Sequence, residues 1–218
     1  MRDVVVRSLT NAVFSDCLKR IYDNVFVNNG ATRLTFEPFM PTDMEYVSPL
    51  AFAGSRSDYA QDFANTEFVW DNPLIPEVPP HLVPDAPLAH VVFKSDVTLV
   101  QTNAFQSLTS RAVVEFHGPS VPELVKLPFY YNGEKNDDRV RILVCNKEAL
   151  AGWRAKVAAN DELYRTSFKR QKPDWPGRRT LGILELSGTL LNRNDSVSVS
   201  YAWVVDGTPG PGFSVLVR

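Results

Sequence analysis

Histidine and cysteine are the residues of this sequence best suited to nucleophilic or metal chemistry. The chain contains three histidines, His81, His90 and His117. A catalytic triad needs a nucleophile, a base and an orienting acid that meet in space, and none of these histidines lies in a recognisable nucleophile or metal-ligand motif. We therefore interpret them as structural or surface residues. The sequence predicts no catalytic residue, no bound cofactor and no metal ligand set.

The cysteines and two acidic pairs are the other residues that could hold a ligand. Cys17 and Cys145 are too few for a disulfide scaffold or a zinc site, and Cys145 lies in the apolar run ILVC, inside a predicted strand. We expect both to be reduced, buried thiols in a protein that matures in a reducing compartment. The pairs Asp137-Asp138 and Asp161-Glu162 are interpreted as solvated charges, with a divalent-ion site shared between chains as the alternative.

A basic cluster is the candidate contact for nucleic acid. Its cations could pair with phosphates and its tryptophan could stack on a base. The alternative, which we favour, is a solvated loop whose charge is balanced by acidic residues elsewhere. The formal net charge of the chain is −2 and no basic arm is present, so we expect no strong non-specific binding of nucleic acid. The cluster consists of Lys169, Arg170, Lys172, Trp175, Arg178 and Arg179.

Strands are the elements that would position most of these residues. The clearest pattern lies at 196–205, where the odd positions, including Tyr201 and Trp203, are apolar and serines fall between several of them. Alternate side chains of a strand share a face, so Tyr201 and Trp203 should lie on the same side. Residues 180–191 read as a second strand, and the polar residues 192–195 favour a turn between the two. The sequence predicts a hairpin around which the core is organised.

The remaining strands indicate the fold class. Together with the hairpin they predict a mainly β fold, namely an antiparallel β-sandwich of jelly-roll type with one or two helices in its connections. No internal repeat is evident, and no apolar run is long enough to insert into a membrane. These further strands are predicted at 90–100, 111–117, 125–131, 140–145 and 213–217.

Two helices are predicted between the strands. Apolar residues spaced by three and four positions predict an amphipathic helix over 15–26. Asn146 is the expected cap of a second helix over 146–168, whose apolar positions include Trp153. Residues 56–69 are ambiguous and allow a short helix.

A proline-rich stretch separates the two parts of the chain. Residues 71–88 hold six prolines, which exclude a helix and a central strand. The stretch is either a domain linker or an ordered extended arm. We favour the arm, because a free linker would not expose so many aliphatic side chains. These side chains are candidate subunit contacts: Leu74, Ile75, Val78, Leu82 and Val83.

The domain organisation follows from this division. Residues 1–70 are expected to be an N-terminal arm with a helical segment, packed on the main domain. Residues 71–89 form the proline-rich extended segment, and residues 90–218 form the β-sandwich. A chain of 218 residues suits a single all-β domain, so we expect the whole chain to form one domain.

The C-terminal stretch LGILELSGTLLNRNDSVSVSYAWVVDG resembles the closing strand pair of jelly-roll capsid proteins from small icosahedral, picorna-like RNA viruses. In that family a strand ending near S-G-T-L is followed by a strand of alternating small polar and aromatic residues. The chain departs from the family in lacking a basic arm and in having a predicted helix within its first 70 residues.

This resemblance implies a non-enzymatic viral capsid protein that self-assembles into an icosahedral shell or decorates one. Such a protein would be found in the virion and assembled in the host cytoplasm. Its partners would be copies of itself and other capsid subunits, with viral RNA and a host receptor as further candidates. The alternative is a non-viral β-sandwich binding module for carbohydrate or protein, and an enzyme with an unrecognised site is a third class.

Overall fold

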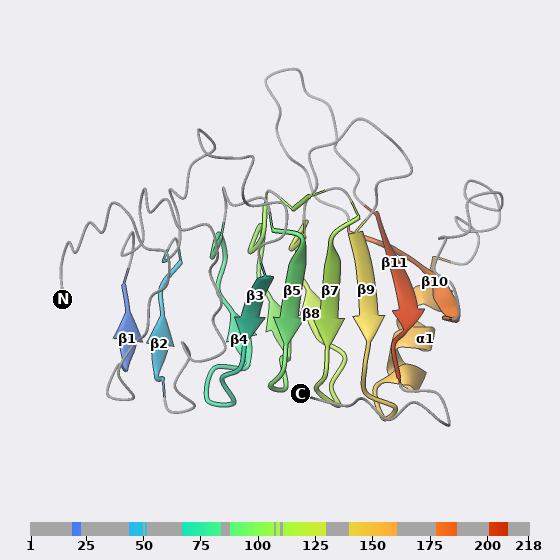
Figure 1. Cartoon of the computed structure of the whole chain (residues 1–218), viewed down its shortest axis with the longest axis horizontal. Helices are drawn as coiled ribbons and strands as arrows, with labels where there is room; N and C mark the ends of the chain where they lie inside the picture. The colour runs from blue at the N-terminus through green and yellow to red at the C-terminus, as the bar shows by residue number, and fades with distance from the viewer. Residues whose placement is uncertain are drawn as a thin grey trace, which may run out of the picture.

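Parallel strands stacked side by side form a β-solenoid (Figure 1). The structure is a computed structural model that describes residues 19–22, 44–49, 51, 67–83, 88–106, 108–109, 111–129, 140–160, 178–186 and 201–208. Its elements are β1 (Arg20–Ile21), β2 (Tyr46–Val47), β3 (Glu67–Trp70), β4 (Glu77–Val78), β5 (His90–Phe93), β6 (Leu99–Val100), β7 (Val113–Phe116), β8 (Glu123–Leu124), β9 (Val140–Val144), α1 (Leu150–Ala158), β10 (Thr180–Glu185) and β11 (Tyr201–Asp206).

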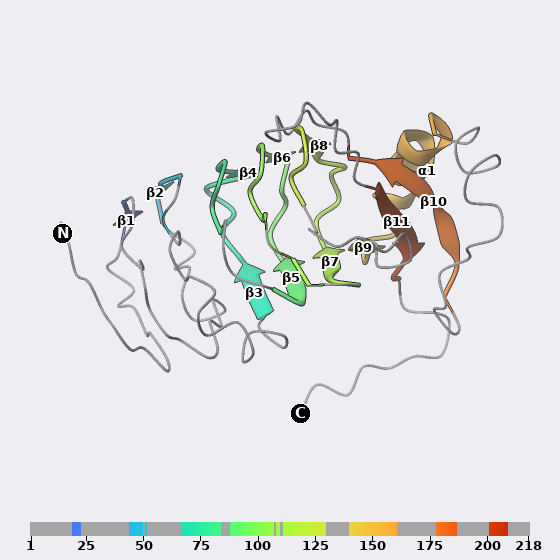
Figure 2. The ribbon, with the colours of Figure 1, turned by 90° about the horizontal axis from the view of Figure 1, so that it is seen from above.

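Three sheets account for the strands in the described part of the chain. The largest has six strands in the order β10-β11-β9-β7-β5-β3, and a second has the order β4-β6-β8. Strands β1 and β2 pair with each other. Every pair is parallel except the antiparallel pair of β10 and β11. Seen from above, β4, β6 and β8 form a row that faces β3, β5 and β7 (Figure 2).

A rung of the solenoid recurs every 23 residues in the central part of the chain. Glu67 of β3 lies in register with His90 of β5, and His90 with Val113 of β7, each 23 positions further on. Val113 then pairs with Arg141 of β9 after a longer connection. The other sides of the rungs keep the same order, through Val78, Val100 and Leu124 and through the bridged residues Val83, Phe105 and Phe129.

Apolar side chains fill the interior of the rungs. The Phe93 and Phe116 rings of neighbouring rungs lie 4.8 Å apart at 21°, and Phe105 and Phe129 stack at 5.8 Å. Phe93 also meets Phe105 edge-on, which joins two sides of the solenoid. Offset-stacked and edge-on aromatic pairs add to the free energy gained from burial. Two inward rows cross the large sheet and are buried, namely Phe68, Val91, Val114 and Ile142, and Trp70, Phe93, Phe116 and Val144.

A buried asparagine fixes the corner after β3. The side-chain amide of Asn72 donates to the Met44 carbonyl at 3.0 Å, and its Oδ1 accepts from the Leu74 N–H at 2.9 Å. Its own backbone N–H donates to Ser95 Oγ. A buried amide is tolerated only when its polar atoms are bonded. Asn72 therefore ties its rung to the chain before it and to the rung after it.

A glycine lets two rungs approach closely at a later corner. A Cβ on Gly118 would lie 2.7 Å from Asp96 Cα, which real side chains do not allow. Across this contact the Asp96 carboxylate accepts from the Ser120 N–H at 3.0 Å and from its hydroxyl at 2.7 Å. The absence of a side chain at Gly118 thus permits the hydrogen bonds that hold the corner.

Helix α1 covers the rung that contains β7 and β8. Its Trp153 is fully buried, with its ring 5.4 Å from that of Phe116, and Lys156 Nζ donates to the Pro122 carbonyl at 2.7 Å. The helix also contacts β10, since a Cβ on Gly182 would lie 3.0 Å from Val157 Cγ2. Stacked repeats need such a cover at their ends. No helix among the described residues has the length and hydrophobicity required to cross a membrane.

The predicted antiparallel jelly-roll sandwich is wrong. The large sheet is parallel from β3 to β11, and each connection from β3 to β5 and from β5 to β7 passes through a strand of the second sheet. The prediction of no internal repeat is also wrong. The repeat escaped detection because its rungs share inward apolar positions and not residue types, so that Trp70 is followed by Phe93, Phe116 and Val144.

Several element boundaries also differ from the sequence-based expectation. The strand predicted at 90–100 is divided into β5 and β6 by the corner near Asp96. Within the strand predicted at 125–131 the described residues show only a bridge at Phe129, since β8 ends before it, at Leu124. The helix predicted over 15–26 is contradicted by β1, and the ambiguous stretch 56–69 ends in β3. Apolar spacing alone could not distinguish a short buried strand from a helical turn.

Other predictions agree with the structure. Strands β7 and β9 confirm those predicted at 111–117 and 140–145. Helix α1 confirms a helix with Trp153 on its buried side, although it begins at Leu150, and Asn146 accepts from the Glu148 N–H in a turn before it. The strand predicted at 213–217 lies outside the described residues.

The predicted hairpin exists, but it does not organise the core. Strand β10 pairs with β11 at one end of the large sheet, and 187–200 lie outside the described residues. Trp203 is buried and Tyr201 packs on the same small apolar cluster, so the expectation that they share a face is confirmed. The main core runs through the stacked rungs, and the hairpin contributes Leu184, Leu186, Ala202 and Val204 to one end of it.

The proline-rich stretch is ordered in the parts that the structure describes. Residues 71–83 turn the corner after β3 and form β4, so this part is extended chain within a rung and not a free linker. The prolines are tolerated because the strand here has only two residues and is followed by turns.

Removing one ring from the stacked interior should destabilise the whole solenoid. Phe105 is fully buried and contacts the rings of Phe68, Phe93 and Phe129. We expect Phe105→Ala to lower the free energy of unfolding by about 3–5 kcal/mol in chemical denaturation. Leu74→Ala, at a residue that is 60 % exposed, is the control and should change it by less than about 0.5 kcal/mol. Equal effects of the two changes would contradict the described packing.

Candidate functional site

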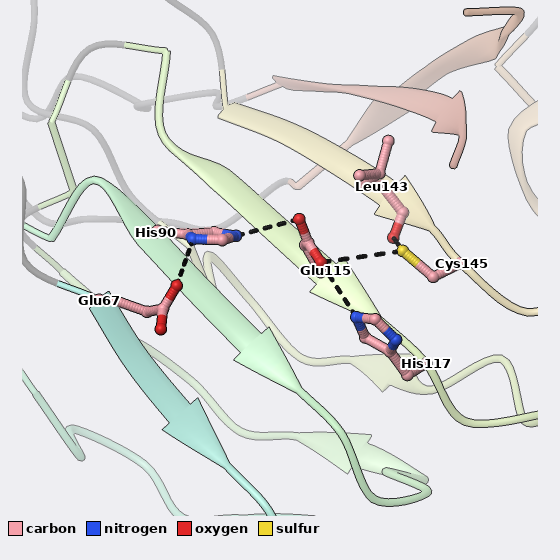
Figure 3. A network of polar contacts seen from close by, with 6 residues as sticks. All are labelled: Glu67, His90, Glu115, His117, Leu143 and Cys145. Atoms are coloured by element: carbon pink, nitrogen blue, oxygen red, sulfur yellow. Dashed lines mark hydrogen bonds and ion pairs between the residues drawn. The ribbon is translucent and has the colours of Figure 1, made fainter. Parts of the chain in front are cut away.

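A row of polar side chains crosses the outer face of the large sheet, and we call it the outer ladder (Figure 3). Residues that alternate with the inward rows of β3, β5 and β7 point outward, because side chains alternate along a strand. Register then sets the neighbours, since Glu67 lies opposite His90 and Val92 lies opposite Glu115. The ladder consists of Glu67, His90, Glu115, His117 and Cys145.

Two residues of the ladder directly follow paired strands. Glu115 and His117 are two positions apart along β7 and its extension, so both face outward. Phe116 lies opposite Val144, which places the next residues, His117 and Cys145, side by side. Cys145 is half-buried on this face and forms no disulfide. The prediction of a buried core thiol at 145 is therefore wrong, because the residue lies just past the strand and on its outer side.

Short contacts link the ladder from end to end. His90 Nδ1 lies 2.8 Å from Glu67 Oε2, and its Nε2 lies 3.1 Å from Glu115 Oε1. The second contact has ion-pair distance but not the alignment of a hydrogen bond, so this buried nitrogen has no aligned partner. A hydrogen bond of 3.0 Å joins His117 Nε2 to Glu115 Oε2. Cys145 Sγ lies 3.9 Å from the same Oε2 and from the Leu143 carbonyl.

The contacts shift the pKa values of the ladder residues. Burial disfavours the charged form of Glu115, but its contacts with His117 and His90 outweigh burial and lower the pKa of Glu115 to about 2. The adjacent Cys145 and Glu115 raise the pKa of His117 to about 9, against the effect of burial. Contact with Glu115 likewise raises the pKa of His90. At neutral pH, Glu115 is therefore an anion between two imidazoles that favour the charged form.

The arrangement does not match a nucleophilic triad. In a triad the imidazole lies between the nucleophile and the orienting acid. Here the Glu115 carboxylate lies between, since one Oε2 atom contacts both His117 Nε2 and the Cys145 thiol. One oxygen, one nitrogen and one sulfur atom instead gather within 4.8 Å of one another, as ligands of a metal ion do. Of the ladder, these three residues could hold an ion.

The structure separates the candidate residues of the sequence. His90 and His117 enter the ladder, whereas His81 occupies a left-handed position, with φ of 50°, before Leu82. Of the basic cluster, Arg178 and Arg179 are exposed before β10. Lys169, Arg170, Lys172 and Trp175 lie outside the described residues, as do Cys17 and both acidic pairs.

The candidate interface residues lie mainly in the chain's own core. Val78, Leu82 and Val83 are almost completely buried within the rung, and Ile75 is half-buried. Leu74 alone among the five is exposed. Any contact that this segment makes with a partner must therefore use Leu74 or its neighbours, and not the whole aliphatic set.

Sequence reasoning missed the two glutamates of the ladder. Glu115-Phe116-His117 was a readable signal, because a carboxylate and an imidazole two positions apart must share one face of a strand. Glu67, His90 and Cys145 gave no such signal. They reach the site through the pairing of separate rungs.

Comparison of the chain with protein-family models, with curated proteins and with solved structures finds no match. The resemblance of the C-terminal strands to picorna-like capsid proteins thus receives no support from these comparisons.

The ladder should make stability depend on pH in a defined direction. A raised pKa in the folded state means that His117 contributes stability below pH 6.5, and this contribution is lost as the pH rises toward about 9. In metal-free buffer the free energy of unfolding should therefore fall over that range, and less steeply in His117→Asn. His81→Asn is the control, since asparagine tolerates a left-handed backbone, and it should keep the slope of the unchanged chain.

For the Glu115 carboxylate we expect the opposite dependence, namely a loss of stability as the pH falls. Its lowered pKa gives a contribution that is present above pH 4.5 and is lost as the pH falls toward about 2. Urea denaturation at several pH values measures both the loss of stability at alkaline pH and the loss at acidic pH. Identical slopes for the unchanged chain and His117→Asn would show that the contact does not stabilise the fold.

Proposed function

We propose that this chain is a non-enzymatic structural protein, a rigid β-solenoid that assembles with copies of itself and with other subunits. The observation that carries the proposal is the interior of the described rungs. Its two main rows are apolar, buried and built on stacked rings such as Phe93 and Phe116. Enzyme sites are generally concave pockets into which several polar groups converge. The two described inward rows consist of packed apolar side chains, and no polar groups converge within them.

A stack of parallel rungs suits a structural role. Each rung contacts mainly its neighbours, and repetition gives extended surfaces on which other molecules can dock. Large apolar side chains that remain exposed are Tyr22, Tyr46 and Leu74 among the described residues. The two tyrosine rings lie 5.8 Å apart at β1 and β2. Such residues are the natural starting points for contacts between subunits.

The narrower proposal places this assembly in a virion. Its support is the resemblance of the C-terminal sequence to the closing strands of capsid proteins. The jelly-roll fold is not part of this proposal. The chain would instead be a solenoid subunit within a viral shell or attached to the surface of one. Viral RNA and a host receptor remain candidate partners within it.

The outer ladder favours a second candidate, a binding protein of solenoid fold. Its charged and polar side chains lie in one row, and they are partly exposed, with 41 % of the His117 side chain accessible. A binding protein would remain monomeric and retain a ligand on this face. The two candidates therefore differ in their state of assembly.

Substitution at two neighbouring apolar residues tests the proposal. Leu74→Asp should leave the free energy of unfolding within about 0.5 kcal/mol, because the residue is exposed, and should reduce the size of the assembled particles. Val78→Asp is the matched change at a fully buried position and should destabilise the fold by about 4 kcal/mol or more, because the carboxylate is buried without a partner. Chemical denaturation and light scattering give the two readouts, and negative-stain microscopy shows the particles.

The unchanged chain provides the decisive outcome. Particles larger than a monomer support assembly, and their loss in Leu74→Asp assigns the contact to this turn. A monomer over the whole accessible concentration range would overturn the structural proposal and favour the binding protein. Particles that persist unchanged in Leu74→Asp would place the contact elsewhere on the chain.

A further inference from the structure

We propose that Glu115, His117 and Cys145 form a binding site for a divalent transition-metal ion, with zinc as the expected ion. One carboxylate oxygen, one imidazole nitrogen and one thiol sulfur lie within 4.8 Å of one another on the outer face of β7 and β9 (Figure 3). Carboxylate, imidazole and thiolate are the three ligand types that proteins use for zinc. The inference does not depend on assembly and goes beyond the proposed structural role.

The ligand separations suit a tetrahedral ion after small adjustments. Zinc bonds of about 2.0–2.3 Å at tetrahedral angles put neighbouring ligand atoms roughly 3.3–3.5 Å apart. The observed separations lie on either side of this range, at 3.0 Å from Glu115 Oε2 to His117 Nε2 and 3.9 Å to Cys145 Sγ. All three ligand atoms lie within 4.8 Å of one another, so rotation of the three side chains toward a common centre would accommodate the ion. It would then replace the proton that joins the carboxylate and the imidazole.

The surrounding residues supply a second layer that holds the ligands in place. His90 Nε2 lies 3.1 Å from the other carboxylate oxygen of Glu115, and His90 Nδ1 lies 2.8 Å from Glu67. Groups that contact metal ligands in this way fix their orientation and increase metal affinity. The buried His90 Nε2 has no aligned hydrogen bond in the ladder as it stands. A rotation of Glu115 toward the ion could align it.

An apolar cluster protects one side of the site. Cys145 packs against the cluster that contains Leu143, Trp203 and Val205. An apolar layer limits the access of water and strengthens the bonds between the ion and its ligands. The other side is open, since 41 % of the His117 side chain is exposed, so an ion can enter from solution. Three protein ligands leave the fourth position of zinc to water.

The chemistry of the ligands also selects among ions. Magnesium and calcium prefer sites made of oxygen atoms, whereas a thiolate and an imidazole favour zinc and its neighbours. The site should therefore bind Zn²⁺ and Co²⁺ and should not bind Mg²⁺.

Competition with a chromophoric chelator tests the site. The full chain, prepared metal-free and reduced, should bind one Zn²⁺, and excess Mg²⁺ should not displace it. Co²⁺ in the same site should show a near-ultraviolet absorption band from charge transfer between thiolate and cobalt. Cys145→Ser should abolish this band and weaken Zn²⁺ binding by more than about 100-fold, beyond the effect typical of a residue that only supports a ligand. Cys17→Ser is the matched control and should keep both the band and the affinity.

A graded effect is expected in the supporting layer. His90→Gln should weaken Zn²⁺ binding by about 10- to 100-fold and keep the charge-transfer band, because the three ligands remain. His81→Asn should change neither. Loss of the band in His90→Gln would mean that His90 is itself a ligand and that the assignment of the three ligands is wrong.

A protection experiment decides the case in which Cys145→Ser does not fold. Zn²⁺ should slow alkylation of Cys145 in the unchanged chain, and mass spectrometry of the peptides identifies the protected thiol. Protection of Cys17 instead, or of neither thiol, would overturn the proposal. Zn²⁺ binding by Cys145→Ser with unchanged affinity would overturn it equally.

Discussion

The packing of apolar side chains between rungs is the constraint on which the rest of the structure depends. Parallel pairing at a fixed register brings Phe93 over Phe116 and Phe105 over Phe129, and these stacked rings leave little freedom for one rung to slide on the next. A shift by one residue would move every inward side chain to the outer face. The interior therefore fixes the register, and the register fixes everything else on the sheet.

The outer ladder is a consequence of that register. Glu67 and His90 lie opposite each other because Phe68 and Val91 pair inside the same two strands. The partly buried position of Glu115 makes its charge costly, and the two neighbouring imidazoles offset that cost. The outer face thus carries a row of matched charges that no single strand contains. A metal ion at one end of the row would use the same register, because His117 and Cys145 come from adjacent strands.

The C-terminal end of the stack shows how a repeated fold is closed. Helix α1 lies over the rung that contains β7, with Trp153 against Phe116. Strand β10 then pairs antiparallel with β11 and so interrupts the parallel order at the edge of the sheet. An edge strand of this kind runs opposite to the parallel rungs, which makes the addition of a further identical rung less favourable.

The sequence by itself determined which residues turn inward along individual strands. Alternation identified the strands at 111–117 and 140–145 and the shared face of Tyr201 and Trp203. The apolar positions after Asn146 indicated a helix that buries Trp153, because each of these patterns is local. The direction and partner of each strand were decided only by the tertiary structure, since alternating side chains look the same in parallel and antiparallel sheets. The ladder shows the same division: Glu115 and His117 can be read from one strand, whereas His90 and Cys145 join them through rungs that pack on a common interior.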